Sequence, residues 1–220
     1  MAILRRAMLT LALTLLAAPA MAEPTLDEVV DGVQAFYEKT DSFKAGFKQE
    51  VKKRYKPGPA IERGGTVYFQ KPGKMRWDYK TPEAVYYVTD GETLWVYEPR
   101  ENTAFKGDIR NSRMASTMKF LFGAGKLRDE FTIELGKTDR AGMVRLELLP
   151  RSGEQGYKKL ALLVDASTFE IRESWLTDPA DDTSHITFSD QTYAPIKNPE
   201  WFDWKPGPEV KVQDLSQLRE

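Results

Sequence analysis

Few side chains in this sequence are of the kinds that catalyse reactions or bind metals. The 220-residue chain has no cysteine and a single histidine, His185. That histidine lies in an alternating segment typical of a β-strand, which favours a surface or hydrogen-bonded position over a catalytic or metal-binding one. A zinc site without Cys or a second His would need carboxylates alone, which is unusual. The sequence therefore predicts no metal, no cofactor and no catalytic site.

The charged residues allow three further kinds of functional site to be considered. Asp178, Asp181 and Asp182 are close enough in sequence to meet a calcium ion, but their spacing matches no known calcium loop, so a solvated acidic turn is favoured. The basic run over 52–56 is interpreted as a solvated strand end rather than a nucleic-acid site, because the chain balances 32 Lys and Arg against 33 Asp and Glu. A pair of carboxylates for glycoside hydrolysis stays open, although no motif points to one.

Residues 1–22 have the layout of a secretory signal peptide. Arg5 and Arg6 form a basic start, residues 7–18 form an apolar stretch too short to span a bilayer, and Ala-Met-Ala at 20–22 is a small-x-small cleavage site. We expect cleavage after Ala22, which leaves a single domain over 23–220. Without a cysteine there is no acceptor for a lipid anchor, so we expect a periplasmic protein.

Two elements are predicted at the start of that domain. Thr25 and Glu28 form a capping box for a helix over 25–39. Its apolar residues recur on one face: Leu26, Val29, Val30, Val33, Phe36 and Tyr37. Strict alternation from 43 to 51 then predicts a half-buried strand, and a second strand returns over 61–70.

The centre of the sequence, residues 64–98, is unusually aromatic. Pro-Gly and Asp-Gly pairs separate runs of alternating residues there, which predicts antiparallel hairpins. Met75, Trp77 and Tyr79 share one face of a strand, while Lys74 and Arg76 lie on the other. In the hairpin over 85–97 both faces carry large apolar side chains, so the pattern does not assign its inner face.

A second short helix is predicted over 111–125. Its apolar face consists of Met114, Met118, Leu121 and Phe122. Methionine adapts to surfaces that repack, and the glycines that end this segment are typical of a movable lid. The plain alternative is that both helices complete a filled core. The chain after 131 is predicted to form a β meander that ends near 193.

Three segments carry a resemblance to a known family: GTVYFQKPGKMRWDY at 65–79, DGETLWVYEP at 90–99 and SFKAGFKQ at 42–49. Weaker matches follow at 160–165 and 202–210. Together they resemble the LolA family, the periplasmic carriers of bacterial outer-membrane lipoprotein sorting. The resemblance implies a mainly β (α+β) fold, an incomplete antiparallel β-barrel whose helices form a lid over an apolar cavity.

The resemblance also implies a function without covalent chemistry. Members bind the acyl chains of triacylated lipoproteins, accept them from an inner-membrane ABC-type release complex and deliver them to an outer-membrane receptor. We therefore expect a monomeric, non-enzymatic carrier that binds no nucleic acid. Three alternatives stay open: a carrier of another lipid such as a glycolipid, a lipoprotein-sensing regulator with the same fold, and a periplasmic hydrolase.

The family pattern extends to individual residues. Lys71 stands at a basic position that holds the lid against the sheet, where other members carry Arg, and Arg76 is expected to compensate for the simpler contacts of lysine. The residues expected to contact acyl chains are Phe47, Val67, Phe69, Met75, Trp77, Tyr79, Trp95, Met114, Met118, Leu121 and Phe122.

Overall fold

The computed structural model describes residues 24–56, 58–109, 125–152 and 156–215. The expected signal peptide and the expected helix over 111–125 lie outside these residues. None of the helices described is both long and apolar enough to cross a lipid bilayer.

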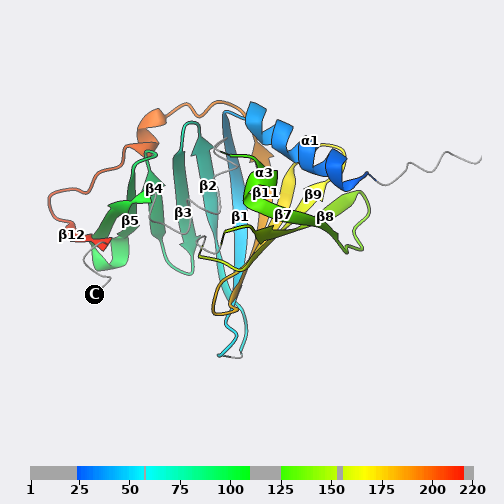
Figure 1. Cartoon of the computed structure of the whole chain (residues 1–220). Helices are drawn as coiled ribbons and strands as arrows, with labels where there is room; N and C mark the ends of the chain where they lie inside the picture. The colour runs from blue at the N-terminus through cyan, green and yellow to red at the C-terminus, as the bar shows by residue number, and fades with distance from the viewer. Residues whose placement is uncertain (1–23, 57, 110–124, 153–155, 216–220) are drawn as a thin grey trace, which may run out of the picture.

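The described residues form one large, mainly antiparallel sheet (Figure 1). Along the sheet the strands follow the order β12-β6-β5-β4-β3-β2-β1-β11-β10-β9-β8-β7, and only the β6–β12 pair is parallel. The first six strands are β1 Ser42–Lys52, β2 Ile61–Gln70, β3 Lys74–Thr81, β4 Val85–Thr89, β5 Thr93–Glu98 and β6 Thr103–Asp108. The others are β7 Phe131–Gly136, β8 Met143–Pro150, β9 Lys159–Asp165, β10 Ile171–Thr177, β11 Thr183–Thr192 and β12 Lys211–Asp214.

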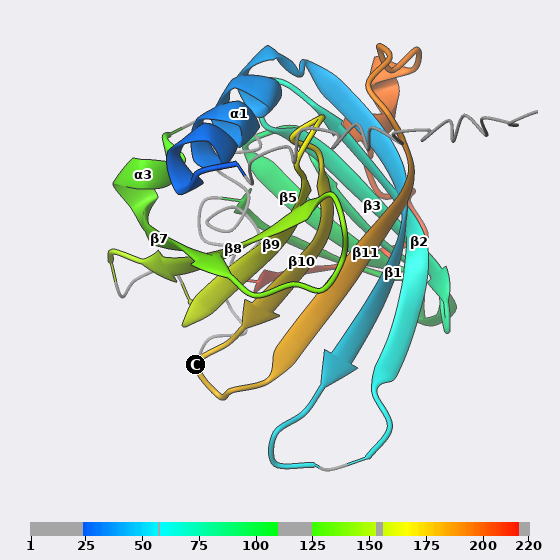
Figure 2. The ribbon, with the colours of Figure 1, turned by 90° about the vertical axis from the view of Figure 1, so that its right-hand side faces the viewer.

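The sheet curls without closing, because β7 and β12 stand at opposite ends of the strand order. Figure 2 shows this curvature, with helix α1 lying over the concave side. The predicted half-barrel is therefore confirmed. The other helical elements in the described part of the chain are short: α3 Leu127–Glu130 and the 3-10 turns η1 Pro99–Glu101 and η4 Pro199–Phe202.

Helix α1, Leu26–Lys39, begins as its sequence predicts. The Thr25 hydroxyl accepts from the Glu28 N–H, and the Glu28 carboxylate accepts from the Thr25 N–H at 2.8 Å. This capping box satisfies two backbone donors that a helix start leaves unpaired. The buried face of α1 consists of Val29, Val30, Val33 and Tyr37.

Two apolar clusters share the concave side of the sheet. In one, α1 packs on β7 to β10 through residues such as Leu146, Leu148, Leu160 and Leu162. The other lies on β1, β2 and β3. Phe188 of β11 touches both clusters. The described part of α1 thus covers one half of the concave side, and a separate cluster occupies the other half.

Candidate functional site

The cluster on β1, β2 and β3 is the candidate site, and we call it the concave apolar cluster. It consists of Phe43, Ala45, Phe47, Val67, Phe69, Met75, Trp77 and Tyr79. Strand register explains why these residues meet. Phe43 is paired with Phe69, which is paired with Met75, and the next row joins Ala45, Val67 and Trp77. Paired residues share a face, so alternation along each strand builds one continuous apolar surface.

Ring contacts fix the shape of this surface. The Phe47 ring meets the Trp77 and Tyr79 rings edge-on, with centroids 4.7 and 4.9 Å apart. Edge-on packing is a favoured arrangement for aromatic pairs. The Trp77 indole N–H donates to the Met75 sulfur at 3.0 Å, so the polar atom of the buried tryptophan has a partner. Six residues predicted to contact acyl chains are thereby brought together: Phe47, Val67, Phe69, Met75, Trp77 and Tyr79.

The cluster becomes polar at its Tyr79 end. The Tyr79 hydroxyl donates to Gln49 Oε1 at 3.0 Å, and Gln49 Nε2 donates to the Ser184 hydroxyl at 2.8 Å. Burial raises the pKa of Tyr79, so its hydroxyl stays protonated and remains a donor at neutral pH. A short chain of hydrogen bonds therefore runs from β3 through β1 to β11 at this end.

Lys71, in the turn between β2 and β3, contacts the end of α1. Its Nζ donates to the carbonyl oxygens of Tyr37 at 2.9 Å and Glu38 at 2.8 Å. Carbonyls in the last turn of a helix lack partners within the helix and carry partial negative charge. A lysine ammonium suits both properties, so Lys71 connects α1 to the strands that carry the concave apolar cluster.

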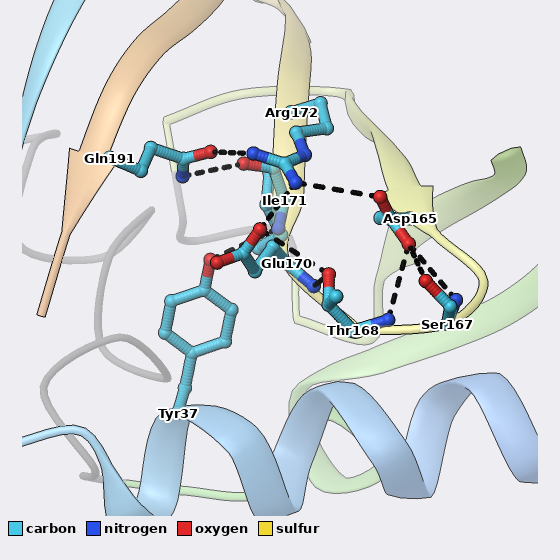
Figure 3. A network of polar contacts seen from close by, with 8 residues as sticks. All are labelled: Tyr37, Asp165, Ser167, Thr168, Glu170, Ile171, Arg172 and Gln191. Carbon is cyan, nitrogen blue, oxygen red and sulfur yellow. Dashed lines mark hydrogen bonds and ion pairs between the residues drawn. The ribbon is translucent and has the colours of Figure 1, made fainter.

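Tyr37 provides a second attachment of the same helix end (Figure 3). Its hydroxyl accepts from the backbone N–H of Ile171 at 3.1 Å, and burial raises its pKa. Beside it, Arg172 donates to Gln191 Oε1 at 3.0 Å and approaches Asp165 Oδ2 at 3.4 Å. Figure 3 shows the Tyr37 side chain extending from α1 toward this network. The last turn of α1 is thus held by β10 as well as by Lys71.

The start of α1 is held by contacts of a different kind. Arg128 of α3 pairs with Asp27 at 2.8 Å and Asp31 at 3.2 Å, with side chains that are largely exposed. Exposed ion pairs contribute little to stability. The Leu127 N–H also donates to Gln34 Oε1 at 2.9 Å. The exposed ion pairs at the start of α1 thus differ from the contacts of Lys71 and Tyr37 at its C-terminal end.

Trp95 lies on the opposite face of the sheet from the concave apolar cluster. It is paired with Val88, which is paired with Arg76, and this row faces the convex side. The Trp95 ring packs against Trp204 of the C-terminal segment, with centroids 5.7 Å apart. Trp95, predicted to contact acyl chains, therefore does not lie with the concave apolar cluster, because the alternation of β5 turns it outward.

The inner face of this hairpin carries Val85 and Tyr87, which pack against the concave apolar cluster. The register between β3 and β4 identifies them, because Tyr87 is paired with Trp77 and paired residues share a face. Together with Phe43 and Ala45, they are members of the site that the sequence prediction omits.

Arg76 also lies on the convex face. Its Nε pairs with Asp78 at 2.7 Å, and its Nη1 donates to the Trp201 carbonyl of η4 at 3.1 Å. Arg76 therefore lies on the face opposite to the one on which Lys71 contacts α1, away from the position expected for a second contact to that helix. Residues that alternate with Met75 and Trp77 face away from the concave side. Met114, Met118, Leu121 and Phe122 lie outside the described residues.

The single histidine, the acidic turn over 178–182 and the basic run over 52–56 have structural partners. His185 Nε2 lies 2.6 Å from Glu173 Oε2, and its ring stacks on Trp175. Asp182 pairs with Lys53 at 2.7 Å, and Asp181 pairs with Arg54 at 2.5 Å and with Lys158. The basic run and the acidic turn thus neutralise each other. Within the described ranges, no cluster of three or more His, Cys, Asp or Glu is placed to hold a metal ion.

Comparisons with known proteins agree with this arrangement. The family described as "Outer membrane lipoprotein carrier protein LolA" matches residues 38–205. A protein from Cupriavidus pinatubonensis named "Outer-membrane lipoprotein carrier protein" is 30% identical over 202 residues, which are 90% of this chain and 91% of the relative. A protein of the same name from Methylococcus capsulatus is 27% identical over 180 residues, 82% of this chain and 85% of the relative.

A solved structure supports the fold independently. The crystal structure of an uncharacterized conserved protein from Thermus thermophilus aligns with a TM-score of 0.54 at 13% identity, covering 86% of this chain and 98% of the other. Since the family match spans most of the chain and includes the strands that carry the concave apolar cluster, the protein belongs to the LolA family of outer-membrane lipoprotein carrier proteins.

Proposed function

We propose that this protein is a periplasmic carrier that buries the acyl chains of triacylated lipoproteins against the concave apolar cluster. The observation that carries the proposal is the continuous row of buried apolar side chains on β1, β2 and β3, with a helix end attached beside it. The names of the relatives, which are carriers of outer-membrane lipoproteins, support the same cargo. Carrying requires reversible burial and no bond making, so the protein acts without catalysis or a cofactor.

Energetics set a condition on how such a carrier works. Each methylene removed from water contributes about 0.8 kcal/mol, so three fully buried acyl chains would bind with tens of kcal/mol and never leave. The carrier therefore offsets this energy by a change of its own structure. We propose that α1 is held down in the empty protein, through Lys71 and Tyr37, and is displaced when cargo enters.

The proposed route follows from the function of the family. After export and cleavage behind Ala22, the single domain over 23–220 accepts lipoproteins from an inner-membrane ABC-type release complex. It then delivers them, as a monomer, to an outer-membrane receptor. The expected helix over 111–125, with Met114, Met118, Leu121 and Phe122, adds further apolar contacts to the bound chains.

Two neighbouring tyrosines on β4 provide a matched test. Both are partly buried, but Tyr87 packs against the concave apolar cluster, whereas Tyr86 stacks on Tyr97 on the convex face. We expect Tyr87→Asp to weaken binding of a purified triacylated lipoprotein at least about tenfold, because a carboxylate in an apolar contact must be desolvated. Tyr86→Asp should bind as the unmodified protein does. Equal effects of the two substitutions would refute binding at the concave face.

A further inference from the structure

One end of the concave face carries hydrogen-bond donors in place of apolar side chains. Along β3 the residues on this face run from Met75 through Trp77 to Tyr79, and the first hydroxyl appears at Tyr79. Tyr79 donates to Gln49 of β1, and Gln49 is the register partner of Arg63 on β2. Tyr79, Gln49 and Arg63 therefore lie next to one another on three adjacent strands, and we call them the donor end.

Arg63 differs from the other arginines that the structure describes. Arg54, Arg76, Arg100, Arg128, Arg140, Arg145, Arg151 and Arg172 each donate to a carboxylate, an amide or a backbone carbonyl. Arg63 is exposed, and its guanidinium makes no such contact within the described ranges. A guanidinium has five N–H donors and no acceptor, so this group is available to bind acceptors.

The register places Arg63 at this end, and the electrostatics of two tyrosines agree with that position. Burial raises the pKa of Tyr79 and of Tyr87, and the positive charge of Arg63 acts on both in the opposite direction. The Glu98 carboxylate also acts on Tyr87 and raises its pKa. Charges of both signs therefore act on the tyrosines at this end of the concave face. Such surroundings suit a neutral ligand that is rich in acceptors better than an anion.

We infer that the donor end binds the ester and amide carbonyls at which the acyl chains of the cargo join its N-terminal cysteine. This inference rests on the proposed function, which places the chains themselves on the concave apolar cluster. Ester carbonyls accept hydrogen bonds and donate none, so they need donors once they leave water. Arg63 and the Gln49 amide supply those donors beside the last aromatic rings of the cluster.

Binding of the carbonyls at the donor end fixes the direction of the cargo. The chain ends point past Trp77 toward Met75 and Phe69, the side on which Lys71 holds α1. The glyceryl group and the polypeptide lie at the Tyr79 end. A carrier with this arrangement distinguishes an acylated protein from a free hydrocarbon of the same length, since only the former has carbonyls to meet the donors.

The test compares two synthetic probes that differ only in their carbonyls. One is an S-diacylglyceryl-cysteine peptide with two ester-linked palmitoyl chains, and the other is the dialkyl peptide with ethers in place of the esters. Both are measured on the full mature chain by displacement of an apolar fluorescent dye. We expect the ester probe to bind about tenfold more tightly, as one or two hydrogen bonds to a charged donor would produce. Arg63→Met should remove most of this difference and leave the affinity for the ether probe unchanged.

Lys52→Met is the matched control. Lys52 is exposed on β1 near the same end of the sheet, but it alternates with Val51 and faces the convex side. This variant should keep the full preference for esters. If the unmodified protein binds both probes equally, or if Arg63→Met keeps the preference, the inference is wrong while the proposed function stands. If neither probe displaces the dye, the proposed function fails and the inference fails with it.

Discussion

The ammonium group of Lys71 lies 2.9 Å from the carbonyl oxygen of Tyr37, and the side chain of the same tyrosine accepts a hydrogen bond from Ile171. One residue of α1 is therefore held from two sides, by the β2–β3 turn through its backbone and by β10 through its hydroxyl. Since β2 and β3 carry the concave apolar cluster, any displacement of α1 by a ligand on that cluster breaks or strains these contacts first.

Removing the Lys71 charge should loosen this end of α1. Lys71→Met keeps most of the side-chain length and removes both hydrogen bonds, which we expect to lower the free energy of unfolding by about 1–2 kcal/mol. If the contact stabilises the closed form, an apolar dye should bind several-fold more tightly, because less energy is needed to displace α1. Hydrogen exchange in the last turn of α1 should accelerate. Unchanged exchange there would contradict this role of Lys71.

Tyr37→Phe tests the second attachment. The substitution leaves the buried N–H of Ile171 without its acceptor, and an unsatisfied buried donor costs about 1–3 kcal/mol. Urea denaturation measures this loss. Tyr68→Phe is a suitable control, since its ring packs on Trp201 at the convex surface and the phenylalanine keeps that packing. A loss no larger than that of the control, whose hydroxyl contacts Thr66, would contradict this cost of the unsatisfied Ile171 N–H.

Asp165 gives a pH-dependent contribution to stability. Hydrogen bonds from Ser167, and then from Thr168 and Arg172, lower its pKa from 3.8 to about 2. A lowered pKa means that the unfolded chain takes up the proton first, so this stabilisation is complete above about pH 4 and is lost as the pH falls toward 2. We expect Asp165→Asn to lower stability by about 1–2 kcal/mol at pH 6 and by less at pH 2.5. The same deficit at both pH values would exclude a role of the carboxylate charge.

The two tryptophans at positions 77 and 95 should separate binding from stability. Trp77→Ala removes a ring from the concave apolar cluster, so both stability and acyl-chain binding should fall, the former by about 3–5 kcal/mol. Trp95→Ala removes only the packing against Trp204 and the convex surface. It should lower the melting temperature while the affinity for an acylated probe stays within about twofold. Weakened binding in a folded Trp95→Ala protein would show that the convex face takes part.

Much of the fold follows from local patterns in the sequence. The capping box at Thr25 and the apolar face of α1 predict the helix, and alternation on β3 assigns Met75, Trp77 and Tyr79 to one face as the structure has them. These signals come from residues that are close together in the sequence, and packing in the sheet leaves the predicted helix and strand unchanged. Local patterns predict no strands at 103–108 and 211–214. The parallel pairing of β12 with β6 depends on a contact between segments far apart in the chain, which no local pattern reveals.

The two residues that lie outside the concave apolar cluster differ in how predictable they are. Alternation along β3 already assigns Arg76 to the face opposite Met75 and Trp77, so its expected role beside Lys71 rests on residue type alone. The orientation of Trp95, in contrast, is decided by pairing across strands. On β5 both faces are apolar, because the C-terminal segment with Trp204 covers the convex side and needs aromatic partners there. The alternation of a strand covered on both sides carries no information about which face is inner. Only the register with β3 settles it.

Photocrosslinking at Tyr87 and Tyr86 tests the central claim most directly. A photoreactive phenylalanine analogue replaces each tyrosine in turn, the full-length protein is expressed in a bacterial host with a lipoprotein sorting pathway, and the crosslinked products are identified by mass spectrometry. Burial of acyl chains on the concave side predicts adducts to the acyl groups of lipoproteins from position 87 and none from position 86. Adducts from position 86, or none from position 87 in a protein that still binds lipoprotein, would contradict the account.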